Sequence, residues 1–159
     1  MKESIKKGIY FGVASGVITT IGLMVGLNSA EGSRLVILGG IFTIAIADAM
    51  SDALGMHLSE ESTNHKTERE IWEATGCTFL SKLFVALSFA PAVVFLDLNL
   101  AINLNIVWGA FLVSYASLRI AREQQAKVGH VILEHLVIMG VVVLIAHQVG
   151  DFVAKVFGA

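Results

Sequence analysis

The chain alternates long apolar stretches with short polar ones. A helix that crosses a bilayer needs about 20 mostly apolar residues. Five stretches have this length and character: 8–27, 35–57, 76–96, 102–122 and 130–157. The longest polar connection, residues 59–72, is the only one that could project far into water. The pattern therefore predicts an all-α polytopic membrane protein, with five transmembrane helices forming a single transmembrane domain over residues 1–159.

Composition supports this prediction. Hydrophobic residues make up 55% of the chain and charged residues only 15%, whereas soluble domains carry about 25% charged residues. The net charge of -2 comes without a basic patch, so we expect membrane lipid and no nucleic acid as a partner. The first apolar run continues to Leu27 and lacks a convincing cleavage site, so we expect a retained first helix rather than a signal peptide.

The basic residues predict an orientation. Arg34 and Lys155 alone lie on one side of the five predicted helices, and the opposite side holds Lys2, Lys6, Lys7, Lys66, Arg69, Arg119, Arg122 and Lys127. Lysine and arginine accumulate on the cytoplasmic side of membrane proteins. We therefore expect an integral membrane protein with a cytoplasmic N-terminus and an external or luminal C-terminus.

The first predicted helix carries glycine at every fourth position: Gly8, Gly12 and Gly16. Small residues at this spacing let helix backbones approach closely within a bilayer. Two interpretations remain open. The glycines could form a dimer seam between two copies of this helix, or they could pack against another helix of the same chain.

A carboxylate pair, Asp48 and Asp52, interrupts the second apolar stretch. A spacing of four places both on one helical face, and a carboxylate near the bilayer centre costs roughly 2.5–3.5 kcal/mol. The pair therefore predicts a cation or proton site. The alternatives are a structural ion pair with Lys82 or, for the shallower Asp52, solvation at the helix end. For Lys82 itself we expect a long side chain that extends to the membrane interface.

Further candidate ligands follow the second helix. If this helix continues into water, His57, Glu61 and His65 lie on one face, with Glu60 and Glu68 alongside. Imidazole with carboxylate suits Fe, Mn or Zn. The alternative is a solvated polar surface. The remaining residues that could contact the ion or its counter-proton are Glu134, His135, His147 and Asp151. No arrangement typical of hydrolases or nucleotide-binding enzymes is present, so we do not expect an enzyme.

Three segments resemble one known family. Residues 15–27, residues 47–59 (ADAMSDALGMHLS) and residues 145–150 (IAHQVG) are similar to the first, second and last helices of the vacuolar iron transporter family. The second-helix motif of that family reads roughly A-G-A-x-S-M-A-x-G-E-Y-x-S. Here Asp52 stands at its methionine position and Met56 at its glutamate position. The chain resembles a short form that lacks the family's larger cytoplasmic metal-binding segment.

This resemblance implies a function. It implies a five-helix protomer, a homodimer with the ion path between the two first helices, and export of Fe²⁺ or Mn²⁺ from the cytoplasm in exchange for protons. No permanently bound cofactor is expected, because the metal is cargo. The metal ligands expected from both lines of reasoning are Asp48, Asp52, Met56, His57, Glu61 and Ser15, with Thr19 as a further candidate. A thioether sulfur favours Fe or Mn over Mg or Ca.

A second function from another class stays open. The same carboxylates could pair with Lys82 and Arg119 in a non-transporting membrane scaffold or assembly protein. In that case the acidic residues of the connection between the second and third helices would bind a protein.

Overall fold

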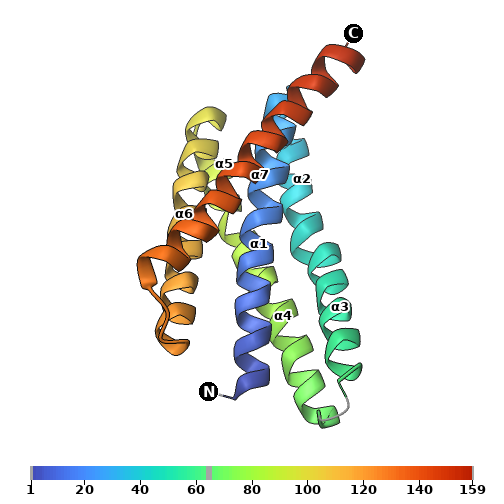
Figure 1. The fold of residues 1–159 in the computed structure, drawn as a ribbon. Helices are drawn as coiled ribbons and strands as arrows, with labels where there is room; N and C mark the ends of the chain where they lie inside the picture. The colour runs from blue at the N-terminus through green and yellow to red at the C-terminus, as the bar shows by residue number, and fades with distance from the viewer. Residues whose placement is uncertain (1, 64–65, 159) are drawn as a thin grey trace.

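The structure, a computed structural model, describes residues 2–63 and 66–158 (Figure 1). Within these residues every regular element is helical. The elements are α1 (Glu3–Ser29), α2 (Arg34–Thr43), the π-helical turn η1 (Ile44–Asp48), α3 (Ala49–Glu61), α4 (Glu68–Ser88), α5 (Ala90–Phe95), α6 (Leu98–Glu123) and α7 (Val128–Phe157).

Five spans in this part of the chain are long and apolar enough to cross a membrane. The α2–η1–α3 segment forms one continuous span and α4–α5 forms another, so the predicted count and fold class are confirmed. The helices extend beyond the predicted apolar stretches because their polar ends remain helical. At α4 the Thr67 hydroxyl accepts from the Glu70 amide while the Glu70 carboxylate accepts from the Thr67 amide. This capping box starts the helix well before its apolar part.

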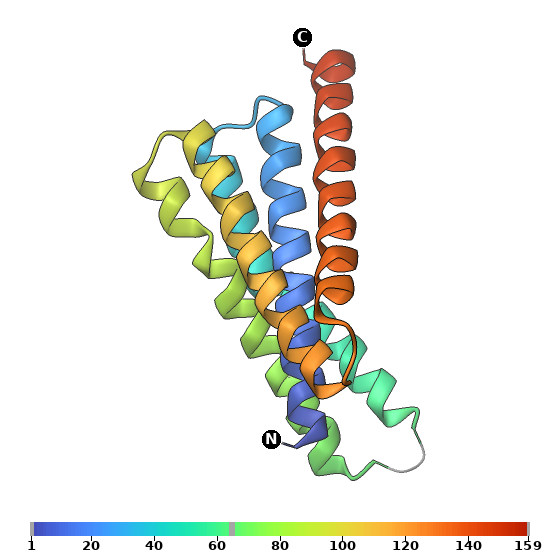
Figure 2. The ribbon, with the colours of Figure 1, turned by 60° about the vertical axis from the view of Figure 1, so that its left-hand side comes forward.

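Helix α1 runs through the middle of the bundle (Figures 1 and 2). Its N-terminal half packs against α4 and its C-terminal half against α7, with α6 and α2 also in contact. The main apolar core combines Val17, Ile21 and Met24 of α1 with residues of α2, α5 and α6. We call the end that carries the N-terminus and the α3–α4 connection the N-terminal end of the bundle (Figure 1).

The glycine ladder of α1 faces α4 of the same chain. A Cβ atom at Gly8 would overlap the Ala74 carbonyl oxygen, and one at Gly12 would overlap Ser81 Oγ. At Gly16 a Cβ would lie 3.1 Å from a methyl carbon of Val85. The dimer-seam interpretation of these three glycines was therefore wrong, and the intrachain alternative is confirmed. The spacing indicates close approach, but it carries no information on which helix approaches.

The second span contains a π-helical turn, η1, that ends at Asp48. A π turn inserts extra backbone into an α-helix and is frequent at functional sites. Here it changes the helical register between α2 and α3, and Asp48 and Asp52 both face Lys82 of α4. The π-helical turn therefore lies at the same place in the span as the carboxylate pair.

Candidate cation site

The central polar cluster surrounds Lys82 of α4 and includes residues of α1, η1 and α3. Lys82 Nζ lies 2.5 Å from Asp48 Oδ2 and 2.6 Å from Asp52 Oδ2. It also donates a hydrogen bond to Ser15 Oγ of α1 at 3.0 Å. The Ser15 hydroxyl in turn donates to Asp52 Oδ2. We call these four residues the Lys82 cluster.

Close packing of α1 on α4 positions the cluster. Gly12 and Gly16 lie against the backbone of Lys82, with a Cβ at Gly12 only 3.1 Å from its amide nitrogen. The lysine side chain consequently starts at the α1–α4 seam and reaches residues of both α1 and α3. The Thr19 hydroxyl donates to the Ser15 carbonyl at 2.8 Å, so Thr19 contacts the helix backbone beside the cluster.

Burial is unequal within the cluster. The Lys82 side chain has 0% exposure, whereas Asp48 and Asp52 retain 38% and 21%. The expectation that Lys82 extends to the interface was wrong. Three oxygen atoms inside the bundle satisfy its ammonium group, which removes the need to reach water.

Charge within the cluster does not balance. Two carboxyl groups meet a single lysine side chain, so the lysine can balance the charge of only one of them. Asp52 receives aligned hydrogen bonds from Lys82 and Ser15. Asp48 Oδ2 meets the ammonium group as an ion pair without an aligned hydrogen bond. The more exposed carboxylate is thus also the one with the weaker hydrogen bonding.

The other predicted ligands are dispersed. Met56 is buried one turn beyond Asp52. His57 lies on a different face of α3, where its Nδ1 is 3.1 Å from Thr75 Oγ1 and its ring meets Trp72 edge-on at a centroid distance of 4.7 Å. Glu61 is exposed at the end of α3. His65 lies outside the described residues.

The structure therefore gathers three of the predicted ligands: Ser15, Asp48 and Asp52. Within residues 2–63 and 66–158, no three His, Cys, Asp or Glu side chains come together closely enough to hold a metal ion. A divalent ion at the carboxylates would need further ligands, such as the Met56 thioether or water. His57 and Glu61 do not share contacts with the cluster.

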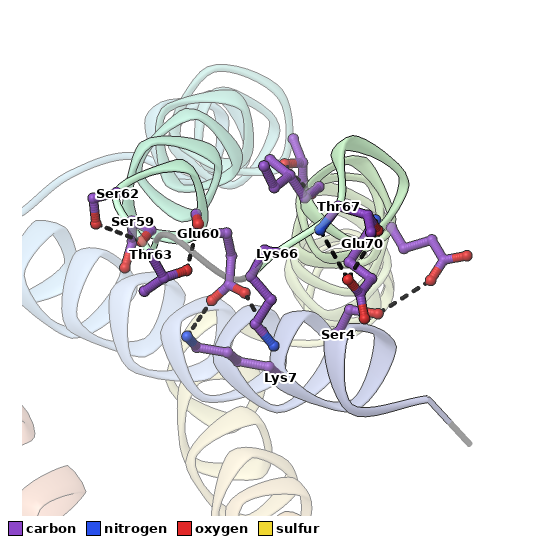
Figure 3. Close-up of polar contacts among 12 residues, drawn as sticks. Ser4, Lys7, Ser59, Glu60, Ser62, Thr63, Lys66, Thr67 and Glu70 are labelled. Atoms are coloured by element: carbon purple, nitrogen blue, oxygen red, sulfur yellow. Dashed lines mark hydrogen bonds and ion pairs between the residues drawn. The ribbon is translucent and has the colours of Figure 1, made fainter.

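Sequence reasoning missed a second polar cluster (Figure 3). Glu60, near the end of α3, is completely buried and pairs with Lys7 of α1, while Lys66 Nζ lies 3.9 Å from its other oxygen. In the sequence Glu60 is only one of several acidic residues that follow the second apolar stretch. The signal that could have found it is its spacing of eight from Asp52: Asp52, Met56 and Glu60 lie at i, i+4 and i+8, within a stripe about 100° wide on one side of a helix.

The remaining candidates contact neither cluster in the described structure. His135 Nδ1 is 2.7 Å from Ser117 Oγ, and Glu134 is exposed. At the opposite end of α7, His147 contacts Ser29 and lies 3.7 Å from an Asp151 oxygen. These residues form local contacts of α7 with α6 and α1.

No protein-family model, curated protein or solved structure matches this chain. The resemblance to vacuolar iron transporters therefore stays a prediction from three short segments. Any function has to be argued from the membrane-spanning architecture and from the polar clusters themselves.

Proposed function

We propose that this membrane protein transports a divalent transition-metal ion, Fe²⁺ or Mn²⁺, out of the cytoplasm in exchange for protons. The observation that carries the proposal is that two carboxyl groups share a single lysine in the Lys82 cluster. A charged group in a membrane-spanning segment is costly and commonly marks an ion pathway. Two carboxylates around one ammonium group provide a place that has to acquire a positive charge.

The two carboxyl groups of the proposed site could exchange protons for the metal ion. A carboxylate that binds the metal in its ionised form can take up a proton once the metal has left. In the proposed cycle, protons carried by Asp48 and Asp52 are exchanged for the divalent ion. An exchange that moves no net charge carries two protons for each divalent ion.

The ligand set fits a transition metal. Asp48 and Asp52 supply carboxylate oxygens, Ser15 a hydroxyl, and Met56 a soft thioether that favours Fe or Mn over Mg or Ca. The remaining ligands would come from water or from a second copy of the chain. A homodimer, which the family resemblance implies, would have to use a surface other than Gly8, Gly12 and Gly16, because α4 covers them.

The proposal also includes the orientation of the protein in the membrane. The excess of lysine and arginine near the N-terminal end of the bundle supports a cytoplasmic location for that end. The metal would then enter from the N-terminal end and leave toward the external or luminal side.

The experiment is flux in proteoliposomes loaded with a metal-sensitive and a pH-sensitive dye. We expect metal entry coupled to proton exit, with two protons leaving for each metal ion if the exchange moves no net charge. Asp48→Asn and Asp52→Asn should each abolish metal entry, whereas Glu31→Gln, an exposed carboxylate in the α1–α2 connection, should leave it unchanged. Metal flux without a pH change, or full flux in both aspartate variants, would refute the proposal.

One observation favours the second candidate, a non-transporting scaffold. Lys82 is completely buried and held by three oxygen atoms, which is also how a structural ion pair is built. A scaffold predicts no metal flux in the wild-type protein and an Asp48→Asn variant that still binds its protein partner. The same liposome measurement therefore separates the two candidates.

A further inference from the structure

The ion pair between Lys7 and Glu60 lies at the N-terminal end of the seam between α1, α3 and α4 (Figure 3). The Glu60 side chain has 0% exposure, and that of Lys7 has 49%. An ionised carboxylate is rarely buried completely unless it is paired. The pair thus lies at a boundary, with its acid inside the protein and its base partly in water.

Helices α1 and α3 are bridged twice in antiparallel register. Ser15 contacts Asp52, and Lys7 contacts Glu60. Each helix advances eight residues between the two bridges, which is about 12 Å along an α-helix. The Lys7–Glu60 pair is therefore placed between the Lys82 cluster and the water at the N-terminal end.

The space between the two bridges is closed. Met56 of α3, which lies midway, is 6% exposed, and Thr78 of α4 is fully buried. Gly12 of α1 packs against Thr78 and Ser81 in the same layer. Water from the N-terminal end reaches the Lys82 cluster along this seam only if α3 moves away from α1 or α4.

Helix α3 is suited to such a movement. It is a continuous helix from Ala49 to Glu61 that begins at the π-helical turn η1. Lys82 forms an ion pair with α3 near the N-terminal end of this helix, and Lys7 forms one near its C-terminal end. A Cβ atom added at Gly55, midway along α3, would meet no atom within 4 Å, so this face of the helix is open.

We propose that the Lys7–Glu60 ion pair is a latch that closes the N-terminal end of this seam. Breaking the pair lets α3 pivot at η1 and exposes Met56, and beyond it the Lys82 cluster, to water. Lys66, 3.9 Å from Glu60, supplies a second cation on the α3–α4 connection. The proposed latch consists of Lys7 and Glu60. This inference adds a conformational element to the proposed transport and does not depend on which ion is carried.

The test measures access to Met56 without measuring flux. A Met56→Cys reporter is placed in a Cys77→Ser background, and the rate of labelling by a hydrophilic maleimide is followed in detergent. Glu60→Gln and Lys7→Gln should each raise this rate severalfold or more. Glu61→Gln is the matched control for the acid because Glu61 is exposed. Lys6→Gln is the matched control for the base because Lys6 pairs with Glu123 of α6 instead.

Each outcome decides the question. An unchanged labelling rate in both Glu60→Gln and Lys7→Gln overturns the latch, and so does an equal rise in the two controls. If Glu60→Gln fails to fold, Lys7→Gln decides alone, since it leaves Glu60 beside Lys66. Because the readout is labelling, a failed latch leaves the transport proposal standing, and a protein without flux can still show the latch.

Discussion

Replacing Lys82 by glutamine should destabilise the protein more than replacing either aspartate of its cluster. Lys82→Gln removes the only cation of the cluster and leaves Asp48 and Asp52 one helical turn apart without compensation. Asp48→Asn or Asp52→Asn instead leaves one carboxylate paired with one ammonium group. The three substitutions remove one charge each, but only the first worsens the charge imbalance.

The distances set the expected size of the effect. At 2.5 Å and 2.6 Å, and with an effective dielectric constant of about 20, each ion pair is worth about 6 kcal/mol before desolvation is subtracted. Removing one partner of a buried pair costs about 3–5 kcal/mol net. Since Asp48 and Asp52 remain partly exposed, we expect about 3 kcal/mol for Lys82→Gln, at the lower end of this range. Each Asp→Asn change leaves Lys82 one carboxylate partner and should cost about 1 kcal/mol, the usual net contribution of one hydrogen bond or partly exposed ion pair.

Thermal unfolding in detergent, followed by the fluorescence of Trp72 and Trp108, measures these differences. For a chain of this size 1 kcal/mol corresponds to about 2–4 °C in Tm. Lys82→Gln should therefore lower Tm by about 6–12 °C and each Asp→Asn variant by about 2–4 °C. Lys155→Gln, at an exposed position in the last turn of α7, is the matched control and should not change Tm.

The double variant gives the sharpest test. Asp48→Asn should lower Tm in the wild-type background and raise it in the Lys82→Gln background, because there it removes one of two uncompensated carboxylates. Loss of stability in both backgrounds would show that Asp48 does not act through charge. A Lys82→Gln protein that melts within about 2 °C of wild type, the shift expected from less than 1 kcal/mol, would refute the reasoning altogether.

The remaining predictions concern selectivity and packing. Met56→Leu, which removes a soft ligand with little change in volume, should reduce Mn²⁺ or Fe²⁺ flux in liposomes more than any Ca²⁺ leak; equal loss of both would exclude the thioether as a selective ligand. Gly12→Leu should force α1 away from α4 and cost at least about 1–3 kcal/mol, the usual penalty of overpacking, measured by the same thermal assay. Gly39→Leu, where a Cβ meets no atom within 4 Å, is its control and should be tolerated.

The five spans were predictable because a bilayer imposes a length and an apolar composition on any helix that crosses it. Asp48 and Asp52 also stood out in the sequence, because charge is rare inside such a span. Helix ends were less predictable, since caps such as the Thr67–Glu70 box extend helices through polar residues. Hydropathy alone does not register these caps.

Two side chains show why the contacts within the polar clusters could not be predicted from the sequence. Lys82 has a flexible side chain that reaches either the interface or the bundle interior, and close packing at Gly12 and Gly16 selects the interior. Glu60 and its neighbour Glu61 look alike in the sequence. In the structure Glu60 is buried and pairs with Lys7, 53 residues earlier in the chain, whereas Glu61 is exposed.

Charge along the second span links the two clusters. Asp48, Asp52 and Glu60 meet three lysines, one each from α1, α4 and the α3–α4 connection, so the whole set is balanced. The groups are distributed unevenly, however, because the Lys82 cluster has two acids and one lysine, whereas Glu60 is one acid beside two lysines. In the proposed cycle, a cation from the N-terminal end would pass Lys7 and Lys66 before it reaches the carboxylates of the Lys82 cluster. If the labelling experiment confirms the latch, its opening precedes metal binding from this end in the proposed cycle.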